Sequence, residues 1–314
     1  MKTIRIGTRG SDLARWQASH VSDLLSRGET DLRMETLVIS TMGDRILDVP
    51  LARIGGKGLF TKEIEEALLD RRIDLAVHSL KDLPTELPDG LALGAVVSAA
   101  DPHDVLVSPG GVGLQELPPS ARIGTSSARR RAQLRRARPD LVILDLRGNV
   151  PTRLRKLEQG EYDAIVLARA GLERLGLLDE RARVLPAGEM LPAPGQGALG
   201  IEVRRGDAES AEVVAKLEDP WGRARTDAER AFLHALGGGC QVPVGALAER
   251  VGGDAGRLLL HGMVADLEGS RILIGEESGA VEAAGRIGSN LASRLIARGA
   301  AEILDAIRLR GDAG

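Results

Sequence analysis

The residue with the clearest chemical potential is Cys240, the only cysteine among 314 residues. It follows three glycines, Gly237 to Gly239, at the end of an amphipathic stretch that is predicted to be helical. Because glycines carry no side chains, the sulfur has room to carry a bulky covalent group. A free cysteine is more commonly a small buried hydrophobe, and this alternative stays open on residue type alone.

A concentration of basic residues between positions 122 and 156 could bind anionic groups. This stretch holds eleven arginine or lysine residues against two aspartates, although the whole chain has a net charge of −3. Arg129 and Arg130 fall in the first turn of a predicted helix that begins after Thr125 and Ser127. Backbone N–H groups and the helix dipole favour an anion at such a position, and guanidinium groups add charge-assisted hydrogen bonds.

Two further arginines follow the next predicted strand, residues 142–144. Arg147 lies just after this strand, where α/β folds place ligand-binding groups, and Arg153 lies in the following helix. Together with the helix start, they predict a site for several carboxylates or phosphates. A charge run is more often a solvated helix face, and we assign that role to Arg135, Arg136 and Arg138.

A third chemical feature is the segment that follows the predicted strand at residues 75–77. Asp82 offers a carboxylate that can hold N–H groups or stabilise a cation, and Lys81 offers a charge to an anionic substrate. A Ser/His/Asp hydrolase site built from His78, Ser79 and Asp82 is not favoured, because such triads are assembled from distant elements. We expect His78 to be a packing residue.

Two other kinds of site are not supported. The glycine loop around Lys57 lacks the full phosphate-binding pattern, since Leu59 replaces the serine or threonine and no strand leads into the loop. The five histidines and single cysteine show no metal-ligand spacing. We therefore predict neither a P-loop nor a metal site.

The elements that must position these residues alternate between strands and helices, which predicts an α/β fold with parallel sheets covered by helices. Strand signals at residues 4–7, 34–40 and 75–77 form a first series, and residues 41–58 form a long loop that could act as a lid. A second series opens at Arg122-Ile123-Gly124-Thr125, which repeats the form of Arg5-Ile6-Gly7-Thr8. We expect two lobes resembling periplasmic binding proteins, joined by a double crossing, with a ligand between them.

The last third differs, with a predicted helix, three strands and two further helices, which indicates a small α+β domain. The predicted domains are residues 1–97 with 198–216 as the first lobe, 103–191 as the second lobe, and 220–314 as the C-terminal domain that carries Cys240.

Composition limits the function classes. Residues are 43% hydrophobic and 28% charged, which is ordinary for a globular protein. Aromatic residues make up 2%, which argues against base stacking with single-stranded nucleic acid. One cysteine excludes an intrachain disulfide and fits a reducing compartment. With no export signal or membrane-spanning segment expected, we predict a cytoplasmic protein, a monomer, without nucleic-acid or membrane partners.

The motifs match a known family in content and order. They are Gly7-Thr8-Arg9-Gly10-Ser11, Gly55-Gly56-Lys57-Gly58-Leu59-Phe60, Val77-His78-Ser79-Leu80-Lys81-Asp82, Gly124-Thr125-Ser126-Ser127-Ala128-Arg129-Arg130, Leu146-Arg147-Gly148-Asn149, Gly195-Gln196-Gly197 and Gly239-Cys240-Gln241-Val242-Pro243. Over essentially its whole length, the chain resembles the porphobilinogen deaminase (hydroxymethylbilane synthase) family.

The resemblance implies a transferase that joins four deaminated porphobilinogen molecules head to tail into hydroxymethylbilane. The chain would grow on a dipyrromethane cofactor bound to Cys240 by a thioether, with Asp82 as the catalytic residue. The implied cofactor-binding residues are Lys81, Asp82, Thr125, Ser127, Arg129, Arg130 and Arg147. The implied substrate-binding residues are Arg9, Ser11, Lys57, Phe60, Arg153, Arg174 and Gln196.

One alternative function comes from another class. Two α/β lobes with a double crossing also describe periplasmic anion-binding proteins, which bind small molecules without catalysis. Such a receptor would need an export signal and would have no use for a thiol behind three glycines.

Overall fold

The computed structural model describes residues 2–28, 32–45, 58–97, 99–238, 242–251 and 254–312. These residues divide into two compact units. Unit 1 holds the described parts of residues 1–47, 58–100 and 197–223, and unit 2 holds residues 101–196 and the described part of 224–314. Within the described residues, the chain therefore passes between the units after residues 100, 196 and 223. The first two passages are the predicted double crossing between the lobes, and the third leads into the C-terminal part.

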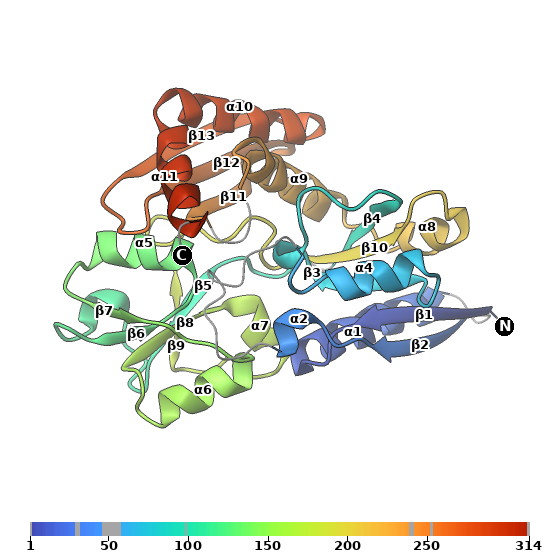
Figure 1. Cartoon of the computed structure of the whole chain (residues 1–314), viewed down its shortest axis with the longest axis horizontal. Coiled ribbons are helices and arrows are strands. Elements are labelled where there is room, and N and C mark those ends of the chain that lie inside the picture. Colours follow the sequence, from blue (N-terminus) through green and yellow to red (C-terminus); the bar gives the residue numbers. More distant parts are fainter. Residues whose placement is uncertain are drawn as a thin grey trace. The chain divides into compact units, whose positions relative to one another are not determined.

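Unit 1 is built around one five-stranded sheet with the order β2-β1-β3-β10-β4. Its strands are β1 (Lys2–Thr8), β2 (Leu32–Val38), β3 (Leu75–Ser79), β4 (Leu91–Val97) and β10 (Leu199–Arg204). Its helices are α1 (Asp12–Gly28), α2 (Met42–Arg45), α4 (Lys62–Leu69) and α8 (Ala208–Ala215), and the short 3₁₀ helix η1 (Leu80–Asp82) follows β3 directly (Figure 1).

Unit 2 contains a second five-stranded sheet and a separate three-stranded sheet. The first has the order β7-β6-β8-β5-β9, from β5 (Asp104–Val107), β6 (Arg122–Gly124), β7 (Val142–Leu144), β8 (Ala164–Ala168) and β9 (Ala182–Leu185). Its helices are α5 (Ala128–Ala137), α6 (Val150–Glu158) and α7 (Arg169–Arg174), with the 3₁₀ turn η2 (Leu114–Glu116). The antiparallel sheet β11 (Val244–Val251), β12 (Asp254–Ala265) and β13 (Ile272–Ala280) is accompanied by α9 (Pro220–Ala235), η3 (Val281–Ala283), α10 (Ala284–Ala297) and α11 (Ala300–Asp312).

This architecture confirms the α/β fold with two sheet-based lobes and a small C-terminal α+β part, but the expectation of purely parallel sheets was wrong. In unit 1, β10 runs antiparallel to both of its neighbours, and in unit 2 the same is true of β5. Each of these strands follows directly after a crossing between the units. A strand that arrives from another unit is not constrained by a helical crossover connection, so it can enter the sheet in either direction.

The two five-stranded sheets repeat one another beyond the short motif noted in the sequence. Ile6 of β1 pairs with the first residue of β3, and Ile123 of β6 pairs with the first residue of β8. In both units the arginine before this isoleucine binds an aspartate that immediately precedes the central strand. Arg5 Nη2 lies 2.9 Å from Asp74 Oδ1, and Arg122 Nη2 lies 2.8 Å from Asp163 Oδ1.

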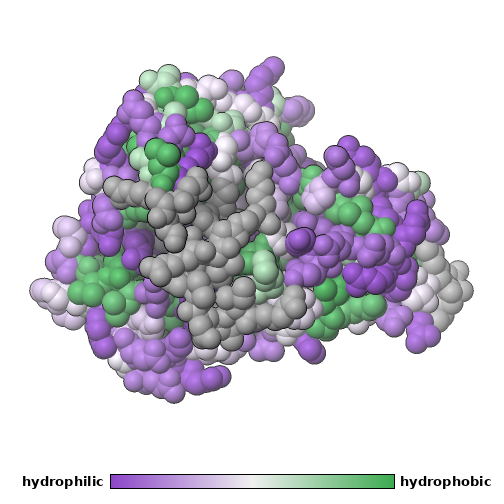
Figure 2. Space-filling view, in the orientation of Figure 1, coloured by the Kyte–Doolittle hydropathy of each residue, from purple (hydrophilic) through white to green (hydrophobic). Residues whose placement is uncertain are grey.

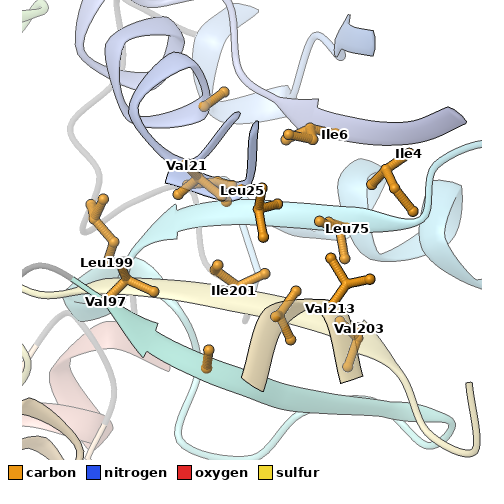
Figure 3. Close-up of a cluster of buried hydrophobic side chains, with 14 residues drawn as sticks. Ile4, Ile6, Val21, Leu25, Leu75, Val97, Leu199, Ile201, Val203 and Val213 are labelled. Carbon is orange, nitrogen blue, oxygen red and sulfur yellow. The ribbon is translucent and has the colours of Figure 1, made fainter. Parts of the chain in front are cut away.

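The core of unit 1 lies on both faces of its sheet. Figure 3 shows Val21 and Leu25 of α1 directed at apolar side chains of the strands, among them Leu75 and Ile201. Successive residues of a strand face opposite sides. Accordingly, Leu75 joins the α1 cluster, whereas Ala76 joins a second cluster with Ile64 and Leu68 of α4.

In the C-terminal part of unit 2, glycines allow two helices to pack closely. Phe232 of α9 is fully buried, and a Cβ atom placed on Gly262 of β12 would lie 2.7 Å from its ring. A Cβ atom on Gly288 of α10 would lie 2.2 Å from the carbonyl oxygen of Ala228. The helices α9 and α10 can therefore approach only because position 288 has no side chain.

The described surface is mainly hydrophilic on the face shown in Figure 2, with hydrophobic residues in scattered patches. Among the described residues, no helix combines the length and apolar character needed to span a bilayer.

We predict that Gly288→Ala lowers the free energy of unfolding by several kcal/mol, about 1–3 from overpacking alone. The matched control is Gly285→Ala in the same helix, where an added Cβ would meet nothing within 4 Å. This control substitution is expected to raise the free energy of unfolding by about 0.5 kcal/mol, because alanine reduces the conformational entropy of the unfolded chain. Urea unfolding followed by circular dichroism measures both changes, and equal effects of the two substitutions would contradict the close helix contact.

Candidate functional site

A pocket in unit 1 brings together side chains from the ends of β1 and β3, from α1, and from the start of α4. Asp82 reaches it because η1 begins immediately after the buried strand β3. Four of the predicted site residues share this pocket, namely Arg9, Ser11, Phe60 and Asp82. The other lining residues are Leu13, Ala14, Gln17, Thr61, Val77, His78 and Ser79.

Arg9 is held at the pocket by two partners. Its guanidinium carbon lies 4.2 Å from the centre of the Phe60 ring, a cation–π contact. Its Nε donates to Asp44 Oδ1 at 3.2 Å, and Asp44 also accepts from the Thr41 hydroxyl at 2.8 Å. Burial alone would raise the pKa of Asp44, but the hydrogen bond and charge of Arg9 lower it. Asp44 was not identified from the sequence, because it lies in the stretch predicted to be an irregular lid.

Two hydrogen bonds fix other parts of the pocket wall. Gln17 Nε2 donates to the Ser79 hydroxyl at 2.8 Å, which ties α1 to the end of β3. The Ser11 hydroxyl accepts from the Ala14 amide at 3.3 Å and so caps the start of α1.

Of the two lysines predicted to bind ligands, Lys81 is half-buried in η1. Lys57 and most of the predicted lid lie outside the described residues.

In unit 2, the two loops that carry predicted anion-binding residues lie side by side. The Ser126 hydroxyl, after β6, donates to the Leu146 carbonyl and accepts from the Leu146 amide, both at 3.0 Å. Ser127 caps α5 by accepting from the Arg130 amide, as the sequence indicated. Arg147 follows Leu146, and Arg153 Nε donates to the Gly148 carbonyl at 2.7 Å. The loops after β6 and β7 therefore form one continuous surface.

Arg129 and Arg130 are directed into the protein and converge on Asp104. Arg129 Nη1 lies 2.8 Å from Asp104 Oδ2, and Arg130 Nη2 lies 2.7 Å from Asp104 Oδ1. The two guanidinium groups are 5% and 7% exposed, and Asp104 is fully buried. Two cations against one carboxylate leave an excess positive charge at the start of α5. The binding of ligand carboxylates by these arginines stays a prediction, and the structure adds that Asp104 already binds both.

Asp104 was missed from the sequence, although it is an acidic residue at the start of an otherwise apolar strand. Burial would raise its pKa, but the charges of Arg129 and Arg130, together with their hydrogen bonds, hold the pKa well below its usual range. Gln196 also donates to Asp104 Oδ1, at 2.8 Å. One carboxylate therefore joins the start of α5 to the segment that leads out of unit 2.

Gln196 and its neighbours are anchored to α9. Arg225 donates to the Gln196 carbonyl at 3.1 Å. Glu229 accepts from the Gly195 amide at 2.7 Å and from the Ala248 amide at 3.1 Å, and burial raises its pKa. The segment around Gln196 is thus bound to the helix whose chain continues toward Cys240. Cys240 itself lies outside the described residues.

Arg174, another predicted binding residue, ends α7. Burial lowers its pKa to about 10, although Glu173 opposes the change. A guanidinium whose pKa is lowered by burial gains stability from an incoming anion.

Among the described residues, no group of three or more acidic, histidine or cysteine side chains is placed to hold a metal ion.

We predict that Asp104→Asn lowers the free energy of unfolding by about 3–5 kcal/mol, because it leaves two buried cations without their carboxylate. Asp101→Asn is the control in the same segment, since Asp101 is 29% exposed, and should cost at most about 1 kcal/mol.

The loss of stability in Asp104→Asn should also depend on pH. A carboxylate whose folded-state pKa is lowered stabilises the protein above its unfolded pKa, about 3.9, and this contribution disappears as pH falls through the folded value. The stability difference between wild type and Asp104→Asn should therefore be constant above about pH 5 and shrink below about pH 4. Urea unfolding across pH measures it, and a difference that grows in acid would refute the assignment.

Comparisons with known proteins agree along the whole chain. Residues 4–212 match the family model described as "Porphobilinogen deaminase, dipyromethane cofactor binding domain", and residues 224–297 match "Porphobilinogen deaminase, C-terminal domain". The porphobilinogen deaminase of Moorella thermoacetica is 53% identical over 98% of this chain and 97% of its own length. That of Nitratidesulfovibrio vulgaris is 52% identical over 100% of this chain and 99% of its own. A more distant likeness is the substrate-binding protein of an amino acid ABC transporter, at 15% identity and a TM-score of 0.37, covering 69% of this chain and 91% of that one.

The family models span both units, and the relatives match from end to end. The chain belongs to the porphobilinogen deaminase family.

Proposed function

We propose that this protein is a transferase that deaminates four porphobilinogen molecules and joins them head to tail into hydroxymethylbilane. The growing chain is bound through a dipyrromethane to Cys240. The observation that carries the proposal is the match of residues 4–212 to a dipyrromethane cofactor-binding domain, together with the concentration of cations in unit 2. A non-catalytic anion receptor, the alternative considered from the sequence, is disfavoured by this family membership.

The residues of unit 2 fit a dipyrromethane chemically. Its two pyrrole rings each carry an acetate and a propionate, so it needs several cationic partners. The cluster of Arg129, Arg130 and Asp104 has an excess positive charge. Within the part of the chain that the structure describes, the buried Nε of Arg130 has no hydrogen-bond partner. Arg147 lies in the adjoining loop, between β7 and α6. When bound, the dipyrromethane supplies the free pyrrole carbon on which the chain grows.

The connection from α9 to β11 is suited to present a thiol in the same unit. It comprises residues 236–243, and Gly237 adopts a positive φ of 59°, which favours glycine. At Gly238 an added Cβ would lie 2.6 Å from Cδ1 of Leu233, so that side chain would have to shift. The chain therefore leaves α9 in a tight turn that favours glycine at position 237.

We assign the catalytic role to Asp82. Loss of ammonia from porphobilinogen leaves a positive charge that spreads over the pyrrole ring and its N–H group. A half-buried carboxylate in a pocket stabilises that charge more than it stabilises the neutral substrate, because water is partly excluded there. In the same pocket, Arg9 and Ser11 would bind the substrate's carboxylates. Lys81, Lys57, Phe60, Arg153, Arg174 and Gln196 stay predicted binding residues, and the cytoplasmic and monomeric states stay predictions.

The proposal is tested first by the intact mass of the purified protein. It should exceed the sequence mass by two porphobilinogen units less two ammonias, since each attachment step forms one bond and releases one ammonia. Cys240 is the only cysteine, so a thioether-bound group can lie nowhere else. Cys240→Ser should lose both the added mass and the activity. A bare wild-type polypeptide that never gains this mass on incubation with porphobilinogen would overturn the proposal.

We also predict that Asp82→Asn lowers kcat by about 10²–10³-fold, as removal of a strong electrostatic stabiliser does, with little change in KM. Asp89→Asn is the control, because Asp89 is an exposed aspartate in the same stretch of unit 1. Steady-state kinetics with porphobilinogen, with circular dichroism to verify folding, measure both variants. A raised KM at normal kcat would show that Asp82 only binds.

A further inference from the structure

Beneath the pocket of unit 1 lies a group of three titratable side chains that the proposed mechanism does not use. Glu65 comes from α4, His78 from β3 and Glu202 from β10. They are 6%, 5% and 0% exposed, respectively. His78 Nε2 lies 3.2 Å from Glu202 Oε2, and His78 also lines the pocket together with Asp82. His78 therefore connects the pocket to two buried carboxyl groups.

Glu202 differs from other buried acids of this protein in its lack of donors. Asp104 accepts from two arginines and a glutamine, and Glu229 accepts from two backbone amides. Among the described residues, neither oxygen of Glu202 has a hydrogen-bond partner, and the same is true of His78 Nε2. The imidazole of His78, at 3.2 Å, is a polar neighbour of Glu202 that can carry a compensating charge.

A buried carboxylate without hydrogen bonds is costly unless a neighbouring charge or a proton compensates it. Two carboxyl groups and one imidazole are neutral together only when they hold two dissociable protons. Burial, reinforced by the charge of Glu202, raises the pKa of Glu65. The charge of Glu66, also on α4, acts on Glu65 in the same direction. The charged groups that share the pocket with His78 are Asp82 of η1 and Arg9, which follows β1.

We propose that Glu65, His78 and Glu202 form a proton-holding cluster beneath the pocket, and that His78 takes up the proton released at each pyrrole addition. This inference rests on the proposed function. In that step a carbon–carbon bond forms between the deaminated methylene group and the free ring carbon of the chain. The C–H bond of that carbon breaks, and its electron pair returns to the ring. The proton moves to His78 and leaves with the released ammonia as ammonium.

A purely structural role predicts a different response to substitution. Glu202 lies in β10 between Ile201 and Val203, all buried. A buried carboxylate that accepts no hydrogen bond carries a desolvation cost that a neutral amide of the same shape largely avoids. If the cluster had no part in proton transfer, Glu202→Gln would therefore leave both stability and activity in place. A positioning role in proton transfer predicts that activity falls while stability does not.

The experiment compares kcat and KM across pH for the wild type, Glu202→Gln, Glu65→Gln and His78→Gln. Proton transfer of this kind contributes about 10²–10⁴-fold, so Glu202→Gln and His78→Gln should lower kcat at least tenfold. The midpoint of the pH profile should move, while KM stays within about twofold and Tm is not lowered in Glu202→Gln. Glu229→Gln, a buried glutamate of unit 2, is the control and should lower Tm without moving the midpoint.

Two results would overturn the inference. One is a pH profile of kcat that is the same in wild type, Glu202→Gln and His78→Gln. The other comes from nuclear magnetic resonance of ¹⁵N-histidine in the purified protein, where the ring signals of His78 should differ between wild type and Glu202→Gln, because the carboxylate 3.2 Å from Nε2 is replaced by an amide. Identical ring signals would refute the cluster. A wild type that carries the cofactor mass but consumes no porphobilinogen would instead refute the proposed function, and the resonance experiment would still decide the cluster.

Discussion

The structure of unit 2 depends on one buried carboxylate, that of Asp104. It opens β5 directly after the first crossing between the units, and it binds Arg129 and Arg130 at the start of α5. Through Gln196 it also reaches the segment just before the second crossing. Burying three charges is expensive, and an apolar cluster of similar volume is often at least as stable. What the ionic cluster provides is a fixed position for two guanidinium groups with one net positive charge between them.

The same network continues to the helix that precedes the cysteine. Gln196 accepts from Arg225, and Glu229 joins the amides of Gly195 and Ala248. Buried polar networks in which the members satisfy one another are rigid, because no member can move without leaving another without a partner. The start of α5, the crossing segment, α9 and β11 are therefore held as one body. If Cys240 carries the cofactor, its attachment point and its predicted cationic partners are built on a common support.

The sequence was most informative where chemistry and local structure coincide in one short segment. The helix start at Ser127, the loop after β7 and the position of Asp82 after β3 were predicted from strand ends and capping residues. Asp104 and Asp44 were not predicted, because the arginines that they bind lie at least 25 residues away in the sequence. The antiparallel strands β5 and β10 were also missed, since strand direction after a crossing is decided by the sheet that receives the strand. Pairing between distant residues leaves no local pattern.

The repeat of the two sheets shows how one scaffold places buried acids in two different surroundings. Both sheets keep the arginine–aspartate pair at one end, through Arg5 and Arg122. They differ at the other end of the central strand. In unit 2 the strand entering after the crossing places Asp104 opposite Ala168, where it gathers cations. In unit 1 the corresponding pairing joins Leu199 to Ser79, which leaves this edge free of a buried acid.

In unit 1 the buried acid is Glu202, three residues after Leu199 in the same pair of strands. It lies beneath the pocket and beside the imidazole of His78, whereas Asp104 of unit 2 lies beside arginines. A shift of three residues along one strand moves a buried carboxylate from the loop edge to the interior of the sheet and to its opposite face. The same strand order thus places a buried carboxylate among arginines in unit 2 and beside an imidazole in unit 1. The partners that surround each acid, and not the sheet that carries it, decide which charges the two units hold beneath their loops.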